Sequence, residues 1–488
     1  MTLFALICLL ARVLLPVGNQ AEFDALQGRL DSVLKAGATD IEVRFSPGTY
    51  FYGENHLSLT SRQHAPCSIS LSGTETYLVA RDTEDGYSID KGYIDLSSLR
   101  PIDIREPVRK ARTWPLKVLF RRHVYRIKCR EADRSPEEVK DWNIILSQWF
   151  KGAVYPVLEI RRGWLYFRKD RDYGTGMWSE LRYGRCLPRY ILCPRPRQEG
   201  LHACGATCFL SVKDCAFSRL SLDGLTFLGN RDGNALIDLE TVHADEISIT
   251  GCAFLGLKSD GIHASEVDNL AVRGCLFREN YLGSIQVEEG CVNARIEDNR
   301  FFDNGLMMTN APVILCRGVD YRVAGNYFED FSYSAIWLGI HYTMPDRFGT
   351  RGVVENNEIC MSDAFRTGVP RELIDGGAVY ISTNNTRTVV RGNYIHDLKG
   401  PHGNRGIFAD DGAIHVDIAS NRVFRVERGR CIDLRRCNWV AWSPKSKVRK
   451  TNVGNRVFDN VYDGRVEIYV RRDDPSSLAR NNRYAESE

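Results

Sequence analysis

The chain has 488 residues, of which 43% are apolar and 26% charged, a composition that fits a folded protein and excludes a disordered one. Its 65 Lys and Arg residues are nearly balanced by 62 Asp and Glu residues, which gives a formal net charge of +3. This near balance of positive and negative charges argues against nucleic acid as the partner, because nucleic-acid-binding proteins concentrate positive charge.

The chain begins with a short apolar segment, residues 1–20, that resembles a signal peptide. Arg12 interrupts it, so it falls short of the roughly 20 uninterrupted apolar residues that a membrane-spanning helix needs. We therefore expect a secreted or periplasmic protein with a signal peptide at residues 1–20 and no membrane insertion. Residues 21–80 are predicted to hold an amphipathic cap helix at 21–36 and a first coil whose tight turn is Ser46-Pro47-Gly48.

Residues 81–210 differ from the sequence on either side of them. They carry Trp- and Tyr-rich strand patterns, such as residues 157–167, and lack the repeat that the rest of the chain shows. We predict a β-rich inserted subdomain that packs beside the main domain.

A short motif recurs from about residue 220 onward and is the strongest signal in the sequence. Each copy has an apolar residue, two spacers, then Asn, Cys or Leu, one spacer, and an aromatic or aliphatic residue. The copies are Leu222/Leu225/Phe227, Ile249/Cys252/Phe254, Val272/Cys275/Phe277, Ile296/Asn299/Phe301, Val323/Asn326/Phe328, Val354/Asn357/Ile359, Val390/Asn393/Ile395, Ile418/Asn421/Val423 and a degraded ninth, Asn452/Asn455/Val457. A fixed motif at variable intervals indicates a solenoid whose coils carry loops of different length. We therefore predict an all-β, right-handed parallel β-helix over residues 211–460, with residues 461–488 as a C-terminal cap.

The recurring Asn residues are expected to form one interior column, because each side-chain amide can bond to the Asn of the next coil and to backbone groups. The predicted members are Asn299, Asn326, Asn357, Asn393 and Asn421. Cys252 and Cys275 take the same position in earlier coils, so we expect buried free thiols there. Cys204 and Cys208 are the best candidates for a local disulfide.

A second short strand lies about ten residues before each motif, and the alternation of side chains assigns its two faces. The outward residues form two columns in which neighbours stack about 4.8 Å apart. The first column is His263, Gln286, Leu315, Trp337, Tyr380, Phe408 and Asp433, and the second is Ser265, Glu288, Arg317, Gly339, Ser382, Asp410 and Arg435.

These columns combine aromatic rings with carboxylates and arginines, a combination that suits sugars. The faces of pyranose rings stack on aromatic side chains, and sugar hydroxyls bond to charged groups. We predict a polysaccharide or oligosaccharide ligand, bound by His263, Glu288, Arg317, Trp337, Tyr380 and Arg435 and by His341 and Tyr342 from a loop. In the alternative, the insertion covers these aromatic residues, which then form a second core.

Four aspartates are candidates for catalysis, and Asp410 is the first of them because alternation directs it outward beside Arg435. Asp411 and Asp375 adjoin glycines, so a turn residue that bonds its own backbone is an equal alternative for each. Asp433 lies on the next rung, with its backbone about 8 Å from that of Asp410. That separation suits the acid and base carboxylates of a glycosidase.

Five segments, namely Phe45–Tyr50, Leu222–Phe227, Asp375–Tyr380, Arg391–Asp397 and Gly406–Gly412, resemble the secreted parallel β-helix proteins that bacteria use on polysaccharides, of the glycosidase and polysaccharide-lyase type. The resemblance implies catalytic acidic residues near the coils of residues 375–380 and 406–412, which here are Asp375 and Asp410 or Asp411. Of the polygalacturonase pattern only the Asp-Asp pair is present. The resemblance is therefore specific for the fold and weak for the substrate.

The sequence thus predicts a glycoside hydrolase that acts on a complex polysaccharide or oligosaccharide with a carboxylate pair on the outer face of the β-helix. We expect a monomer with no metal and no cofactor. Two other classes stay open. A lyase or epimerase acting on uronic-acid polymers would depend on Arg317 or Arg435, and calcium would then be a candidate cofactor; the other class is a non-catalytic carbohydrate-binding protein or adhesin.

Overall fold

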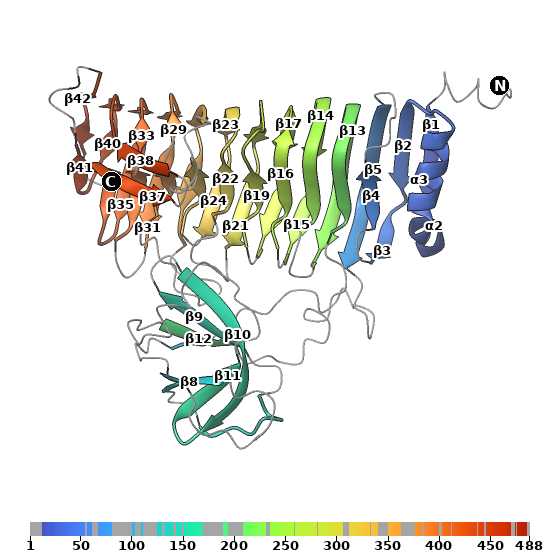
Figure 1. Ribbon diagram of the computed structural model, residues 1–488, viewed down its shortest axis with the longest axis horizontal. Coiled ribbons are helices and arrows are strands. Elements are labelled where there is room, and N and C mark those ends of the chain that lie inside the picture. Colours follow the sequence, from blue (N-terminus) through green and yellow to red (C-terminus); the bar gives the residue numbers. More distant parts are fainter. Residues whose placement is uncertain are drawn as a thin grey trace.

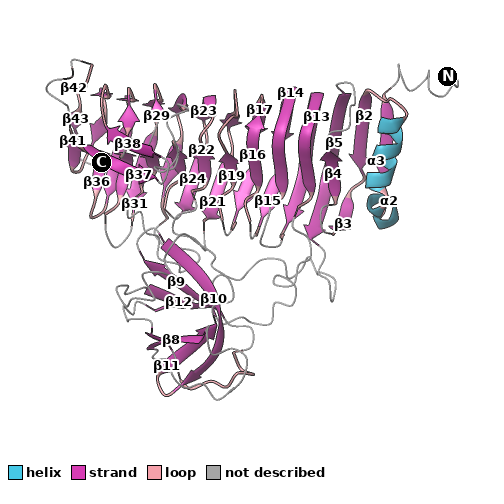
Figure 2. Ribbon diagram, viewed as in Figure 1, coloured by secondary structure: helices cyan, strands magenta, loops and turns pink. Residues whose placement is uncertain are grey.

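The chain folds into a long stack of β-strand coils with two short helices at its N-terminal end (Figures 1 and 2). The computed structural model describes residues 12–53, 56–60, 67–80, 100–102, 109–110, 124–128, 132–139, 143–148, 151–168, 189–193, 208–230, 235–257, 259–280, 282–305, 312–331, 333–339, 350–362, 376–382, 385–399, 403–410, 412–436, 438–443, 446–469, 474 and 476–485.

A full coil contributes one strand to each of three parallel sheets. Sheet 1 contains β4 (Leu57–Thr60), the first parts of β13 (Leu210–Leu228) and β14 (Ile237–Thr250), β16 (Ile262–Val267), β19 (Ile285–Val287), β22 (Ile314–Cys316), β25 (Ile336–Leu338), β28 (Val379–Ile381), β32 (Arg405–Ala409), β36 (Arg430–Leu434) and β41 (Val466–Ile468).

Sheet 2 contains β1 (Val13–Val17), β2 (Asp40–Phe45), the first part of β5 (Cys67–Ala80), later parts of β13 and β14, β17 (Leu270–Arg273), β20 (Arg295–Glu297), β23 (Val319–Ala324), β26 (Arg351–Glu355), β30 (Val389–Arg391), β34 (Asp417–Ala419), β39 (Arg456–Phe458) and β42 (Leu478–Arg480). Sheet 3 contains β3 (Gly48–Tyr52), the ends of β5 and β13, β15 (Ala253–Leu255), β18 (Leu276–Arg278), β21 (Arg300–Asn304), β24 (Tyr327–Phe331), β27 (Glu358–Cys360), β31 (Tyr394–Leu398), β35 (Arg422–Val426), β40 (Val461–Tyr462) and β43 (Arg483–Tyr484).

Equivalent residues of successive coils pair in register throughout the stack. In sheet 1, for example, Ile262 is paired with Ile285, and Ile285 with Ile314. Connections between parallel strands of this kind are right-handed, because a right-twisted strand returns to its sheet most readily in that sense. The fold is therefore the predicted all-β, right-handed parallel β-helix.

The interior repeats from coil to coil because the register places the same kind of residue at the same height. Sheet 3 supplies a continuous column of phenylalanine rings, whose centroids lie 4.6–5.2 Å apart. The column consists of Phe227, Phe254, Phe277, Phe301 and Phe328, and each of these rings is at most 1% exposed. The third residue of the sequence motif is thus a core residue, and stacking of the aromatic rings adds to the burial of apolar surface.

The predicted interior column of asparagines is confirmed. Asn326, for example, donates from its amide nitrogen to the Oδ1 of Asn357 at 2.9 Å and to the carbonyl of Ile296 at 2.9 Å, and its backbone N–H also donates to the Oδ1 of Asn357. The same pattern links Asn357 to Asn393 and continues to Asn421. Each amide therefore satisfies buried groups at a turn, where the sheets cannot do so.

The C-terminal segment continues the stack, which differs from the predicted cap at residues 461–488. Asn460 and Asn482 extend the asparagine column, and β40 to β43 pair with the preceding coil or with one another. The ninth motif copy is also shifted from its predicted position. Val457 pairs with Ile418 and is the first residue of that copy, whereas Asn455 bonds to the backbone N–H of Val416, outside the column.

The N-terminal end is closed by α2 (Gln20–Asp24) and α3 (Leu26–Lys35), in agreement with the predicted cap helix. Asn19 caps α2 by accepting a hydrogen bond from the backbone N–H of Glu22. The predicted signal peptide stays a prediction, but the structure uses part of that segment: Val13–Val17 forms β1, which pairs with β2. Cleavage after Gln20 would therefore remove a strand of sheet 2.

The inserted subdomain departs from the stack between β5 and β13, which nevertheless pair directly with each other. Its described strands form a separate antiparallel sheet beside the stack (Figure 1). They are β6 (Arg100–Ile102), β7 (Arg109–Lys110), β8 (Val124–Lys128), β9 (Asn143–Gln148), β10 (Lys151–Arg161), β11 (Trp164–Arg168) and β12 (Arg189–Cys193). Two small pairs complete the fold, β29 (Asn385–Thr386) with β33 (Ala413–Ile414) and β37 (Asn438–Ser443) with β38 (Ser446–Thr451).

The outer face of sheet 2 carries a row of ion pairs that crosses successive coils. Arg322 bonds to both Glu297 and Glu355, and Glu355 also accepts a hydrogen bond from Arg391 at 2.7 Å. Burial opposes the ionisation of Glu355, but the hydrogen bonds from Arg391 and Arg322 outweigh it, so its pKa lies below the usual value. Ion pairs therefore link four successive coils, those of β20, β23, β26 and β30, along this face.

Candidate functional site

The outer face of sheet 1 carries the two predicted columns of side chains in the predicted register. Strand pairing aligns the first column from His263 through Gln286, Leu315, Trp337, Tyr380 and Phe408 to Asp433. Asp238 precedes this column and Glu467 follows it. In the second column, the backbone N–H of Asp410 bonds to the carbonyl of Ile381, and that of Arg435 bonds to the carbonyl of Ala409.

The aromatic residues of this face form a packed strip rather than the exposed row that the sequence predicted. We use the term aromatic strip for Tyr333, Trp337, Tyr380 and Phe408. The ring centroids of Trp337 and Tyr380 lie 5.8 Å apart and those of Tyr380 and Phe408 lie 5.2 Å apart. Tyr380 is 7% exposed and Phe408 is fully buried, so the prediction of exposed rings is wrong for these two. Trp337 is the member of the strip that keeps a partly exposed ring.

Trp337 is fixed in orientation by two neighbours from the second column. Its indole N–H donates to the hydroxyl of Ser382 at 2.7 Å, and the guanidinium of Arg317 lies 5.6 Å from the ring centroid. The hydroxyl of Ser382 in turn donates to the carbonyl of Leu338. A partly exposed ring that is held so firmly is a suitable platform for the apolar face of a sugar.

Asp410 lies at the end of β32, next to the aromatic strip. The Tyr380 hydroxyl donates to its Oδ2 at 3.3 Å, and the residue is 6% exposed. Its column neighbours are Ser382 on one side and Arg435 on the other. The structure therefore places Asp410 beside Tyr380, with Arg435 following it in the second column. The other predicted residues of this region, Asp411, Asp375, His341 and Tyr342, lie outside the described residues.

Asp433 has surroundings that differ from those expected of a solvent-facing carboxylate. It is fully buried, and its Oδ2 accepts hydrogen bonds from Arg405 at 2.8 Å and Arg430 at 3.1 Å, with Arg435 Nε 3.7 Å away. The guanidiniums of Arg405 and Arg435 lie 4.1 and 4.6 Å from the ring centroid of Phe408. These contacts explain why Phe408 is buried, and they make Asp433 the anchor of an arginine cluster.

The predicted binding residues of the first coils form a second polar group on the same face. His263 Nδ1 lies 2.8 Å from Asp238 Oδ1, and this hydrogen bond raises the pKa of His263. Arg317 donates to Glu288 at 2.5 Å. The structure thus pairs Glu288 with Arg317 and leaves His263 about one-third exposed.

Asp260 belongs to this polar group, and the sequence analysis missed it. Although part of the residue is accessible, burial of the carboxyl group raises the pKa of Asp260 to about 6. Its Oδ1 accepts a hydrogen bond from Gln286, and a side chain on Gly283 would come within 2.9 Å of that oxygen. The signal in the sequence was the Asp260-Gly261 pair before β16, which looks like an ordinary turn.

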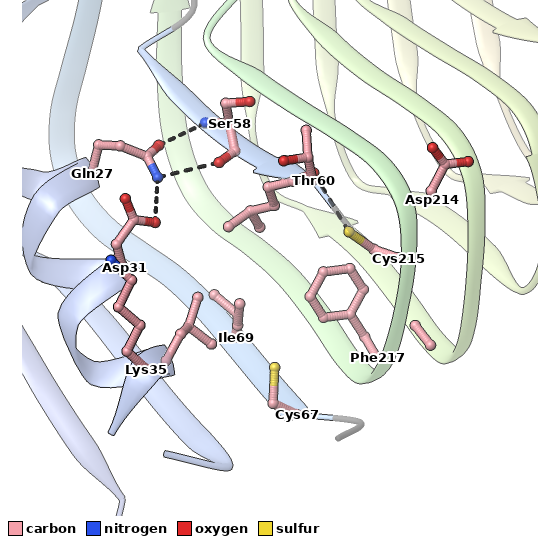
Figure 3. Close-up of a pocket in the computed structure, with 13 residues that line it drawn as sticks. Gln27, Asp31, Lys35, Ser58, Thr60, Cys67, Ile69, Asp214, Cys215 and Phe217 are labelled. Carbon is pink, nitrogen blue, oxygen red and sulfur yellow. Dashed lines mark hydrogen bonds between the residues drawn. The ribbon is translucent and has the colours of Figure 1, made fainter. Parts of the chain in front are cut away.

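A pocket of 810 Å³ lies elsewhere, at the N-terminal cap, between α3, β4, β5 and β13 (Figure 3). Gln27 bridges Asp31 and the backbone of Ser58 at its edge. The predicted site residues do not line it, and an extended glycan is better matched by an open face with aligned columns than by this pocket. We therefore place the candidate site on sheet 1.

Fold and register define the chain as a right-handed parallel β-helix protein. Residues 204–338 and 241–441 match the model of a family described as "Right handed beta helix region". No sequence of a curated protein matches the chain. Neither described helix is long and apolar enough to cross a membrane.

Three solved structures are similar to this chain to different degrees. One, described as "Glycoside hydrolase", has 12% identity and a TM-score of 0.51, with 98% of this chain and 95% of that chain covered. The A-module of the Azotobacter vinelandii mannuronan C-5 epimerase AlgE6 has 11% identity and a TM-score of 0.34, with 97% of both chains covered. PfbA, a surface adhesin of Streptococcus pneumoniae, has 10% identity and a TM-score of 0.30, with 98% and 92% covered. At 12% identity, the likeness to the first of these structures shows the fold alone.

Proposed function

We propose that the protein is a glycoside hydrolase that cleaves a polysaccharide or oligosaccharide bound along the outer face of sheet 1. The observation that carries the proposal is the position of Asp410, whose carboxylate lies at the Tyr380 hydroxyl beside the aromatic strip. Trp337 supplies a ring platform for a sugar, and Asp410 supplies a group that can exchange a proton with a glycosidic oxygen or a water. The solved structure described as "Glycoside hydrolase" has the same fold as this chain.

Asp410 is proposed as the general acid or base, with Asp375 or Asp411 as the second carboxylate. Asp433 is proposed as a positioning residue, because its carboxylate is already held by Arg405 and Arg430. Arg435, which lies over Phe408 next to Asp410, is proposed to orient the substrate.

The test is a panel of glycans assayed both for new reducing ends and for unsaturated products that absorb near-ultraviolet light. A hydrolase yields reducing ends only. Asp410→Asn keeps the size of the side chain but removes proton transfer, so activity should fall about 10²–10⁴-fold with folding unchanged. Asp320→Asn, in an exposed ion pair with Arg351 on sheet 2, is the matched control and should keep full activity.

Asp260 is the second candidate for the catalytic carboxyl group, favoured by its raised pKa. It lies about five rungs from Asp410, or roughly 24 Å, so the two cannot act on one bond. If Asp260 is the acid, activity should fall as the pH rises through about 6, and Asp260→Asn rather than Asp410→Asn should abolish it. If Asp410→Asn loses its activity and Asp260→Asn keeps it, the reaction takes place at Asp410.

The arginines of this face favour a second candidate reaction class, that of a lyase or epimerase acting on uronic-acid polymers. Arg435 is the better candidate for neutralising a uronate, because Arg317 is hydrogen-bonded to Glu288 at 2.5 Å, whereas Arg435 lies 3.7 Å from Asp433, a carboxylate that two other arginines already hold. Unsaturated products that vanish in Arg435→Gln would replace the hydrolase proposal with a lyase. Binding of a glycan without any product would leave a carbohydrate-binding protein or adhesin instead.

We also propose that the protein acts outside the cytoplasm, as a secreted or periplasmic monomer. The experiment is N-terminal sequencing of the protein recovered from the medium or periplasm. A start after residue 20 would mean that the mature stack begins at α2, without β1.

A further inference from the structure

Two cysteines occupy the asparagine column in the coils that precede Asn299. Cys252 lies between β14 and β15, and Cys275 lies at the equivalent point between β17 and β18. The strands on both sides of them pair in register, Thr250 with Arg273 and Ala253 with Leu276. The carbonyl of Cys252 accepts a hydrogen bond from the backbone N–H of Leu276 at 2.9 Å. The two thiols are therefore stacked on successive coils.

The spacing within this column brings side-chain atoms of neighbouring coils into direct contact. Farther along the column, the amide nitrogen of one Asn lies 2.9–3.1 Å from the Oδ1 of the next. Stacked coils are about 4.8 Å apart, which lies inside the range of Cα separations, about 4.4–6.8 Å, that disulfides span. Only a small approach is then needed for one sulfur to reach the other.

Both thiols are enclosed, each residue being 1% exposed. Each sulfur also faces carbonyl oxygens: that of Cys275 contacts the carbonyls of Ile249 and Arg273 at 3.4 Å, and that of Cys252 contacts the carbonyl of Thr250 at 3.4 Å. The contact with Cys275, together with burial, raises the pKa of Cys252 well above its usual value. In the folded chain both sulfurs are enclosed and Cys252 is poorly reactive, so oxidation belongs to the folding stage.

We propose that Cys252 and Cys275 form a disulfide that joins two successive coils when the chain folds in the presence of a small-molecule disulfide. The thiolate of one cysteine attacks the small-molecule disulfide and releases one thiol. The second cysteine then attacks the mixed disulfide and releases the other. In total, the protein loses two protons and two electrons and one Sγ–Sγ bond forms, while the small-molecule disulfide takes up the two protons and two electrons and becomes two thiols.

Cys360 and Cys431 are an internal control for this proposal, because both are buried but neither is stacked on another described cysteine. Cys360 is paired with Glu329 and His396. Ile432, the residue after Cys431, is paired with Ile407 and Val466, which places Cys431 between Gly406 and Arg465. These two thiols should stay reduced under the conditions that oxidise Cys252 and Cys275.

The test is to refold the full chain from denaturant with a mixture of reduced and oxidised glutathione. Free thiols are then alkylated in denaturant, and the digested protein is analysed by mass spectrometry. We expect a peptide pair linked through Cys252 and Cys275, about 2 Da lighter than the two reduced peptides together. Cys360 and Cys431 should be alkylated. In Cys252→Ser, Cys275 should become fully alkylated.

The proposal is overturned if Cys252 and Cys275 are both alkylated in the refolded wild-type chain, or if either carries glutathione or is linked to a different cysteine. The measurement uses the wild-type chain, so it does not depend on the folding of the variant. A linked pair should also show itself as a shift of the urea unfolding midpoint to higher concentration, which a reducing agent reverses.

Discussion

Asn357→Ala should destabilise the protein more than the loss of one ordinary hydrogen bond would. The side chain of Asn357 makes four hydrogen bonds: its Oδ1 accepts from the backbone and amide nitrogens of Asn326, and its Nδ2 donates to the carbonyl of Val323 and to the Oδ1 of Asn393. The alanine variant keeps none of them.

The size of the effect follows from the groups that are left without a partner. Asn393 Oδ1 still receives the backbone N–H of residue 357, and Asn326 Nδ2 still bonds to Ile296. The backbone N–H of Asn326 and the carbonyl of Val323 lose the bonds that Asn357 made, in a column where Asn357 is 1% exposed. At about 1–3 kcal/mol for each buried group without a partner, the expected loss for the two groups is roughly 2–6 kcal/mol.

The assay is urea unfolding followed by circular dichroism, with Asn482→Ala as the matched control. Asn482 makes the same kind of bonds to Asn460, but it lies at the partly exposed end of the column, where water can replace it. Asn357→Ala should therefore lower the unfolding midpoint clearly more than Asn482→Ala. Equal midpoints for the two variants would refute the argument that burial makes the column important.

Three further predictions follow from the core, the ion-pair row and the aromatic strip. Phe277→Ala should lower the free energy of unfolding in urea by about 3–5 kcal/mol, because the ring is fully buried. Phe302→Ala, on the outer face of sheet 3, should lower it clearly less. Similar losses would contradict a stabilising role of the interior phenylalanine column. Glu355→Gln should lower the free energy of unfolding by about 1 kcal/mol near neutral pH. The difference from wild type should vanish as the pH falls below about 4, because a carboxylate with a lowered pKa stabilises the fold only while it is ionised. A difference that does not change with pH would exclude an ionic origin. Trp337→Ala should weaken glycan binding roughly tenfold in calorimetry with little effect on the turnover rate, and unchanged binding would remove Trp337 from the site.

The fold could be predicted well because each coil of a solenoid is specified by residues that lie close together in the chain. Each motif copy places an apolar residue, a turn residue and a ring at fixed offsets, so Ile296, Asn299 and Phe301 could be assigned without knowledge of distant contacts. The prediction failed at the C-terminal end, where Asn452, Asn455 and Asn460 offered several registers. Only the pairing of Val457 with Ile418 decides between them.

The candidate site was predicted less well, because it depends on how long side chains are arranged. Alternation correctly directed Tyr380 and Asp433 away from the interior of the helix, but it carried no information on what covers them. Arg405 and Arg430 come from the same strands as Phe408 and Asp433, and their turn toward Asp433 is not visible in a pattern of apolar residues. Asp260 was missed for a related reason, since its pKa depends on enclosure rather than on its neighbours in sequence.

The point at which the inserted subdomain leaves the stack bears on how such a protein can acquire new parts. The chain departs after Ala80 and returns at Leu210, yet β5 and β13 pair directly along most of their length, with two shifts in register. Other coils cross the same corner with a short connection, as between Leu255 and Ile262. An architecture that tolerates one domain of this size at a corner offers equivalent grafting points at every coil, because no strand pairing has to be broken to open one.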